Sequence, residues 1–467
     1  MPLPHFRTCF LIPQARWIMQ QLMKRLLQGL YWMAKVFGLL AATSTPTKQT
    51  EATSTTTTSS TKRCGKGKTR QPSGRMEWKL HYSRYWRLHG YLVMIFVGCY
   101  SPYAFWTIFC RMSFLRQNRL LLIIGFNRYV LVLFCAFFTL YIHTSKQKSM
   151  LKCLNGLLNN QRELKRLMMP VSENCRTTSA SYLHTWNHSI ALGVFLICFV
   201  CSSSHTVQLL SIDPEVPRNI AYAFSLFFVF LCQLCLELSL GMYFLALLLI
   251  THLVHQCNVL LKQILNDVND IHRRHTQTLH RRTFYSAQQY WLSLELWQVL
   301  RVHFDLMRLS RCITSLHGGQ MLCFMAFVPM ECMVHLFISY FVYYSRAFLR
   351  RFHRRLPLNM YAMVFIGSLF INLSLVILYT HRMKRKFAET RNTLSWGVTA
   401  LPSGNWMTKQ LRETIQYWGL YLKQGKRIFR ITACGLFKLN NAILFCIVQG
   451  MLIYMMILIQ FDKVINK

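Results

Sequence analysis

Acidic residues are scarce in this sequence, with only 15 Asp and Glu among 467 residues against 54 Lys and Arg. That balance does not fit the two or three soluble domains that a chain of this length would otherwise suggest. The 17 cysteines show no zinc-site spacing and no disulfide framework, since the pairs Cys198/Cys201 and Cys232/Cys235 lie inside apolar segments. No clean cleavage site follows the apolar stretch 29–42, so a cleaved signal peptide is not expected.

The apolar residues, which make up 53% of the chain, are concentrated in long blocks. A bilayer core of roughly 30 Å needs about 20 apolar residues at a rise of about 1.5 Å each. Only helices can cross singly, because each satisfies its own backbone polar groups. The sequence therefore predicts an all-α membrane protein with seven transmembrane helices, near 88–109, 120–141, 188–210, 220–250, 318–344, 359–379 and 440–461.

The basic residues predict the orientation of these spans. With the N-terminus in the cytosol, the inside segments hold 42 of the 54 Lys and Arg residues and the outside segments hold 11, while Arg128 lies within a span. Because Lys and Arg are enriched in cytoplasmic loops, we expect a cytosolic N-terminus and an extracellular C-terminus. The formal net charge of +39 belongs mostly to these loops, so a nucleic-acid partner is not expected.

The rest of the chain is organised around the spans. Before the first span we expect a cytosolic amphipathic element (1–42) and a disordered linker that is Thr/Ser-rich and basic (43–87). The six-helix ligand-binding region (88–379) follows and includes two antiparallel cytosolic helices (251–317). A cytosolic loop (380–439) with a helix at 408–431 then leads to the last span (440–461) and an extracellular tail (462–467). The cytosolic helices either form an assembly interface beneath the membrane or pack only against one another.

Three charged residues lie inside predicted spans, where charge is costly and is therefore a candidate for function: Arg128, Glu237 and Glu331. Either the two glutamates line a polar pocket between helices, or Arg128 pairs with one of them as a structural tie. His335 follows Glu331 by one turn, and we expect it to be a hydrogen-bond neighbour rather than a metal ligand. No metal or cofactor site is predicted.

The last predicted span has two different sides when it is projected at about 100° per residue. One stripe holds Gln449, Ile453, Met456 and Gln460, and roughly opposite lie Tyr454, Leu458 and Phe461. In an oligomer the first stripe could line a pore with an apolar constriction and a ring of amides. The alternative is that the glutamines hydrogen-bond across a closed helix bundle.

The end of this span resembles the signature of insect gustatory receptors, which is Thr-Tyr, five hydrophobic residues and then Gln-Phe. Tyr454, Gln460 and Phe461 match with the five apolar residues between them, whereas Ile453 replaces the threonine. Two further stretches look like short elements of that family: Gly435-Leu436-Phe437 and Trp32–Leu40. The Thr/Ser-rich linker is unusual for the family.

The resemblance implies a ligand-gated cation channel in the plasma membrane, assembled as a homo- or hetero-tetramer with other gustatory receptors. In such receptors the last helix lines a central pore, and cytosolic helix ends anchor the subunits. Carried over, Gln460 and Phe461 would belong to the gate, and Tyr454 would support the pore helix. Asp462 follows at the outer mouth, where four copies could attract cations, which is an inference from its charge.

The resemblance also implies a small-molecule tastant as the ligand. Sugar-sensing members place an acidic residue after the motif tyrosine, where this chain has Met455, which favours a bitter, otherwise aversive or contact chemical and leaves the carbon-dioxide branch open. An aromatic pocket would suit hydrophobic, often cationic ligands. The candidate pocket residues are Tyr103, Trp106, Tyr222, Phe224, Glu331, Tyr340 and Tyr361.

Three other classes compete with this interpretation. A seven-helix G-protein-coupled receptor has the opposite orientation, and the sequence lacks Asp/Glu-Arg-Tyr after span three and Asn-Pro-x-x-Tyr in span seven. A transporter would be expected to show inverted repeats with paired broken helices, which the sequence does not show. A multi-pass enzyme has no supporting nucleophile or metal constellation.

Overall fold

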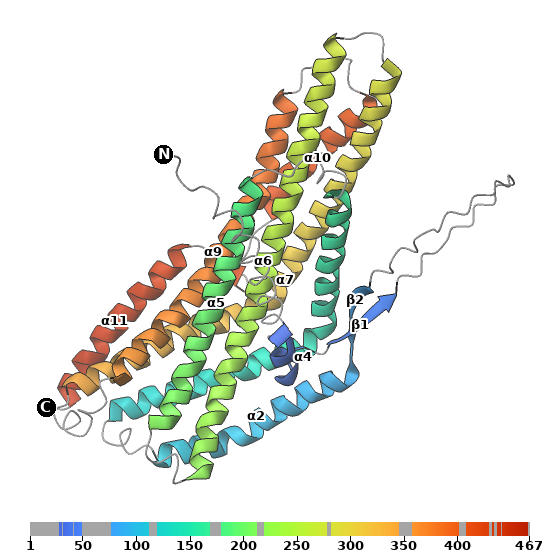
Figure 1. The fold of residues 1–467 in the computed structure, drawn as a ribbon. Helices are drawn as coiled ribbons and strands as arrows, with labels where there is room; N and C mark the ends of the chain where they lie inside the picture. The colour runs from blue at the N-terminus through green and yellow to red at the C-terminus, as the bar shows by residue number, and fades with distance from the viewer. Residues whose placement is uncertain are drawn as a thin grey trace, which may run out of the picture.

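The computed structural model is built almost entirely of long helices (Figure 1). It describes residues 28–29, 31–40, 42–48, 76–111, 119–168, 179–212, 219–277, 282–344, 357–400, 408–428, 432–433, 437–439 and 441–465.

Seven described helices correspond one to one with the predicted spans. They are α2 (Arg84–Arg111), α4 (Arg119–Met168), α5 (Ser179–Ile212), α6 (Ile220–Gln277), α7 (Arg282–Tyr344), α9 (Pro357–Ala400) and α11 (Asn441–Ile465). Six of them are long and apolar enough to cross a membrane, and α5 adds a shorter apolar stretch, Asn187–Ser203. The chain is therefore an all-α, multi-pass membrane protein, as predicted.

Several helices continue far beyond the apolar spans. Helix α6 has 58 residues and α7 has 63, so each is about 90 Å long, roughly three times the thickness of a bilayer core. Their polar halves are the two antiparallel helices predicted in 251–317, and α10 (Lys409–Ile428) lies beside them where 408–431 was predicted to be helical (Figure 1).

Two helices continue past their predicted spans, α4 beyond 120–141 and α9 beyond 359–379 into the predicted cytosolic loop. Helix α4 runs on to Met168 and α9 to Ala400. The continuation of α9 buries only one apolar side chain every one or two turns, namely Met383, Phe387 and Leu394. Because that spacing is sparse and the residues between are basic, the sequence reads as a solvated loop although the backbone stays helical.

The buried side chains form two main cores. The larger lies among the apolar spans and includes Phe195, Phe244 and Phe327, each almost fully buried. The second joins the polar halves of α6 and α7 to α9 and α10, and α10 contributes Leu411, Ile415 and Trp418. The extended helices thus form a second packed body that is continuous with the membrane region.

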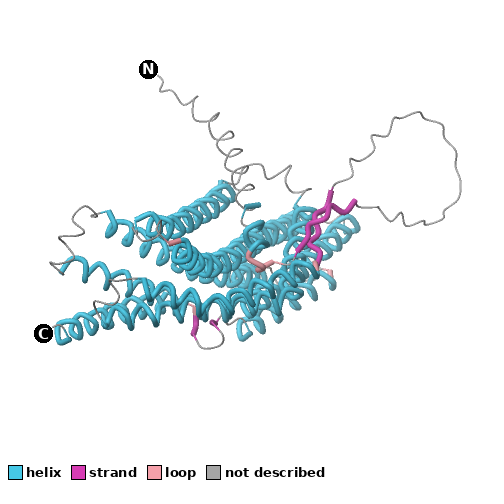
Figure 2. The backbone as a smooth tube through the Cα atoms, turned by 90° about the horizontal axis from the view of Figure 1, so that it is seen from below, coloured by secondary structure: helices cyan, strands magenta, loops and turns pink. Residues whose placement is uncertain are grey.

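The linker predicted to be disordered has ordered ends. Strand β1 (Ala42–Lys48) pairs antiparallel with β2 (Met76–Tyr82). Figure 2 shows this ribbon projecting from the bundle at the end away from the C-terminus. The Asn155 side chain donates to the Leu80 carbonyl (2.8 Å) and accepts from the Leu80 amide (3.1 Å), which fixes β2 to α4. Residues 49–75 lie outside the described part. Two short strands, β3 (Thr432–Ala433) and β4 (Phe437–Lys438), precede α11.

The N-terminal element packs closely on the bundle. Leu39 and Leu40 are buried, and the Lys35 ammonium lies 4.3 Å from the ring centroid of Trp86. Gly38 has a positive φ of 71°, and a Cβ atom there would lie 2.7 Å from the Gly90 Cα, so only glycine allows this approach. Residues 1–27 of the predicted amphipathic element lie outside the described residues.

Candidate functional site

Helix α11 contacts its own chain along a single stripe. The partly buried residues packed on the cores are Ile443, Leu444, Ile447, Met451, Met455 and Leu458. These contacts are with α7 and α9, and Figure 1 shows α11 at the edge of the bundle along α9. Leu458 therefore packs against its own chain. Tyr454 and Phe461 stay exposed in the single chain.

The glutamine stripe points away from the bundle. Gln449, Ile453, Met456 and Gln460 are all exposed. On a helical projection their mean direction lies about 180° from the mean direction of the packed stripe. Asp462 is partly buried in the last turns of α11, close to Gln460. The side of α11 that carries its amides is thus the side that its own subunit does not cover.

The charged residues in α4 and α7 form an ion pair. Arg128 Nε donates to Glu331 Oε1 at 2.8 Å and to Oε2 at 3.0 Å, and His335 Nε2 lies 3.5 Å from Oε2. Glu331 is fully buried, whereas the Arg128 side chain is 28% exposed. Of the two alternatives that the sequence left open, the structure contains the Arg128–Glu331 pair, and His335 lies beside the same carboxylate.

Glu237 forms a separate polar contact between α5 and α6. The Ser202 hydroxyl donates to Glu237 Oε2 at 2.5 Å, and the Gln233 amide approaches Oε1 at 3.4 Å. All three side chains are buried. Glu237 and Glu331 therefore have different partners, and the structure does not join them in one hydrogen-bonded group.

The aromatic candidates for the ligand pocket fall into different places. Tyr103 and Phe224 are exposed and both contact Tyr100, at ring-centroid distances of 5.5 and 5.3 Å. Tyr222 is buried in a small cluster with Ile108 and Tyr129. Tyr340 packs in another cluster, to which α11 contributes Met455 and Leu458. The side chain of Tyr361 lies outside the described part. The six candidates whose side chains are described do not converge on one enclosed pocket.

Trp106 lies in an open groove between α2 and α4. The groove has a volume of about 500 Å³, and its aromatic lining residues are Phe105, Trp106, Phe126, Tyr129, Phe134 and Phe137. The Tyr129 hydroxyl donates to the Ser101 carbonyl at 2.6 Å. A groove of this size and lining could accept a hydrophobic molecule of drug-like size.

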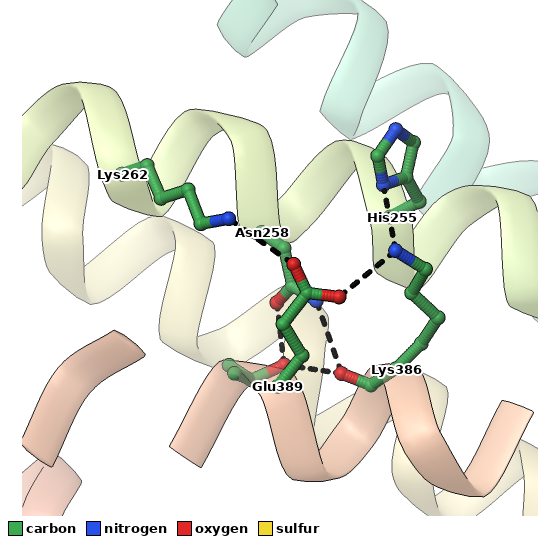
Figure 3. Close-up of polar contacts among 6 residues, drawn as sticks. His255, Asn258, Lys262, Lys386 and Glu389 are labelled. Atoms are coloured by element: carbon green, nitrogen blue, oxygen red, sulfur yellow. Dashed lines mark hydrogen bonds and ion pairs between the residues drawn. The ribbon is translucent and has the colours of Figure 1, made fainter. Parts of the chain in front are cut away.

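Sequence reasoning missed a polar clasp between the extensions of α6 and α9 (Figure 3). Glu389 accepts from Lys386 at 2.8 Å and from Lys262 at 3.1 Å. Burial alone would raise the pKa of Glu389, but the hydrogen bonds and charges of these two lysines outweigh it and hold the pKa below its ordinary value. His255, beside Lys386, has its pKa lowered to about 4 by burial and by the lysine charge.

The second half of this clasp is uncharged. The Asn258 amide donates to the Lys386 carbonyl at 3.0 Å and accepts from the Thr390 hydroxyl at 2.5 Å. These residues lie 128 or more positions apart in the chain, so sequence spacing carries no signal of their meeting. Among the described residues, no group of three or more His, Cys, Asp or Glu is placed to hold a metal ion.

Comparison with known proteins assigns the chain to a family. The sequence model of the family described as 7tm chemosensory receptor matches residues 27–465, nearly the whole chain. A Drosophila melanogaster protein provisionally named gustatory receptor 77a is 50% identical over 392 residues, which cover 83% of this chain and 86% of that protein. Both findings point to a receptor rather than an enzyme. The chain belongs to the 7tm chemosensory receptor family and is a member of the insect gustatory receptors within it.

Proposed function

We propose that this receptor is a ligand-gated, non-selective cation channel of the plasma membrane, formed by four subunits around a pore lined by α11. The subunits are copies of this chain or other gustatory receptors. Gln449, Ile453, Met456 and Gln460 face the lumen, Phe461 belongs to the gate region and Tyr454 supports the pore helix. Asp462 attracts cations to the outer mouth.

The exposure of the glutamine stripe carries this proposal. A polar side chain that faces lipid is unfavourable, because hydrocarbon offers its amide no hydrogen-bond partner. Gln449 and Gln460 lie on the side of α11 opposite its packed stripe, so their own subunit does not satisfy them. A water-filled lumen between subunits would hydrate both amides and leave the packed stripe in place.

The extensions of the helices beyond the apolar spans carry a second surface that supports subunit assembly. Beyond the apolar spans, large aromatic side chains of α7 and α10 remain exposed: Tyr290, Trp291, Trp297, Phe304 and Tyr417. The Trp297 and Tyr417 rings lie 5.6 Å apart, which makes the surface continuous between the two helices. Exposed apolar surface of this kind outside a bilayer marks a protein interface, so these helices are proposed to anchor neighbouring subunits with the N-terminus in the cytosol.

The proposed ligand is a bitter, otherwise aversive or contact chemical. Met455 stands where sugar-sensing members carry an acidic residue, and the aromatic groove that holds Trp106 suits a hydrophobic molecule better than a sugar. The exposed pair Tyr103 and Phe224 around Tyr100 offers further ring faces to a ligand that carries a positive charge.

Two neighbouring methionines give a matched test of the pore face. Met456 is 63% exposed on the glutamine stripe, whereas Met455 packs against α7. Each is changed to cysteine in a Cys446→Ser background, because Cys446 is an exposed native thiol on the same helix. The receptor is expressed alone and with partner receptors, and tastant-evoked current is recorded before and after a charged, thiol-reactive reagent. We expect block in Met456→Cys and unchanged current in Met455→Cys.

Equal modification of both cysteines, or modification of Met455→Cys alone, would place the lumen elsewhere. Gln460→Ala provides a second check, since it should change conductance or ion selectivity. Currents that keep their conductance and selectivity in this variant would remove α11 from the pore.

A further inference from the structure

Basic side chains of three helices meet where the apolar spans of α5, α6 and α9 end. His188 lies at the start of the apolar part of α5, and His252 and His255 follow the predicted span 220–250 in α6. Arg382 and Lys386 follow the predicted span 359–379 in α9. These five residues are called the basic cluster. None of them belongs to α11 or to the aromatic groove.

The members of the basic cluster are held close together. The His188 ring centroid lies 5.9 Å from that of His252 and 5.5 Å from that of Tyr379. The Arg382 guanidinium lies 5.2 Å over the Tyr379 ring and donates to its hydroxyl at 3.4 Å. Figure 3 shows the other end, where Lys386 Nζ lies 3.4 Å from His255 Nδ1. The convergence is therefore a product of tertiary packing.

The cluster carries more positive charge than its surroundings neutralise. Glu389 is already shared between Lys386 and Lys262. Within the described residues, no carboxylate forms an ion pair with Arg382, whose side chain is exposed. Burial and the charge of Lys386 lower the pKa of His255 to about 4, so this ring is neutral near pH 7. A bound anion would supply the missing negative charge.

We propose that the basic cluster binds a phosphomonoester anion, with Arg382 as its main contact. The guanidinium offers a planar fork that matches phosphate oxygens, Lys386 adds a point charge, and imidazole rings can donate further hydrogen bonds. A phosphomonoester carries up to two charges and three acceptor oxygens, which suits donors that come from α6 and α9 together.

The level of the cluster points to a lipid as the source of the phosphate. The cluster begins where the hydrocarbon-spanning residues end, which is the depth of lipid headgroups. With the N-terminus in the cytosol, as proposed above, this depth belongs to the inner leaflet, where basic pockets between helices hold anionic and phosphoinositide headgroups. A soluble inositol phosphate shares the same chemistry, and the experiment separates the two.

The test uses the full chain in nanodiscs of phosphatidylcholine, with or without phosphatidylinositol bisphosphate, and compares Arg382→Gln with Arg385→Gln. Both arginines are exposed on α9 and lie one turn apart. Among the described residues, Arg382 contacts the hydroxyl and ring of Tyr379, whereas Arg385 makes no such contact. Retained lipid is counted by native mass spectrometry after delipidation. We expect retention to fall about tenfold in Arg382→Gln and to stay within about twofold of the parent in Arg385→Gln, because a charge-assisted hydrogen bond contributes more than 1 kcal/mol.

The remaining outcomes are decisive as well. If soluble inositol trisphosphate binds and the lipid does not, the site exists and its source is cytosolic. If both arginine variants lose lipid equally, or the parent retains none and binds no inositol phosphate, the cluster is not a site. Should Arg382→Gln elute as an aggregate, His252→Gln carries the same comparison, since His252 is partly exposed at the same cluster.

Discussion

The ion pair between Arg128 and Glu331 leads to a prediction of how much stability its removal should cost. Glu331 is fully buried between helices, so its negative charge depends mainly on the Arg128 guanidinium beside it. Changing Arg128 to Met keeps most of the side-chain stem and removes the charge. The buried carboxylate then keeps only the His335 imidazole, at 3.5 Å, as a nearby ring nitrogen. Breaking a buried pair in this way costs about 3–5 kcal/mol.

The reverse change should cost less. In Glu331→Gln the arginine loses its partner, but its side chain is 28% exposed and can extend toward polar headgroups. We expect a loss of about 1–2 kcal/mol, the range for a hydrogen bond to a charged group. The double variant, which leaves no uncompensated charge, should be more stable than Arg128→Met alone.

The assay is the free energy of unfolding in mixed micelles under increasing sodium dodecyl sulfate, followed by intrinsic fluorescence. Arg119→Met is the control, because Arg119 is an exposed arginine at the start of the same helix. It should stay within about 0.5 kcal/mol of the parent. The reasoning fails if Arg128→Met costs less than about 1 kcal/mol, or if Glu331→Gln costs more than Arg128→Met.

Two further predictions concern the parts outside the spans. Gly38→Ala should destabilise the docked N-terminal element by about 2 kcal/mol or more, because alanine is strained at positive φ and its Cβ would meet the Gly90 backbone. The loss is measured as reduced protection of this element from proteases. Gly193→Ala is the neutral control, because a Cβ at Gly193 would lie in open space. His255 has a folded-state pKa of about 4, below its ordinary 6.5, so its contribution to stability is present above pH 6.5 and is lost as the pH falls toward 4. His255→Gln should therefore flatten the pH dependence of thermal stability in that window, and an unchanged profile would assign it to other groups.

The helices were predictable where their apolar residues are dense or strictly periodic. Helix α10 was located from its amphipathic stripe, which ends on the buried Trp418. The continuation of α9 was missed because its run His381-Arg382-Met383-Lys384-Arg385-Lys386 has the composition of a solvated loop, and only Met383 is buried there. The contacts that hold this continuation are made with α6, α7 and α10, and a single sequence does not show them.

The candidate site was predictable in part, for a related reason. Charged residues are rare in spans, so Arg128 and Glu331 could be singled out and their pairing offered as one alternative. Aromatic residues face both lipid and core in a membrane protein, so Tyr222, which is buried, and Trp106, which is exposed, look alike in sequence. The basic cluster could not be predicted from the sequence, because its histidines and cations come from three helices.

The unbroken length of α7 has a mechanical consequence. From the start of its apolar span at about residue 318 back to Arg282, the helix continues for about 54 Å at 1.5 Å per residue. Such a rod acts as a lever arm: a tilt of about 5° within the membrane moves its far end by about 5 Å, close to one helical turn. Small displacements of α7 at the bilayer, which leave side-chain packing there unchanged, are thus enlarged at the distal end of the helix. At that end they reach the scale at which helices change register.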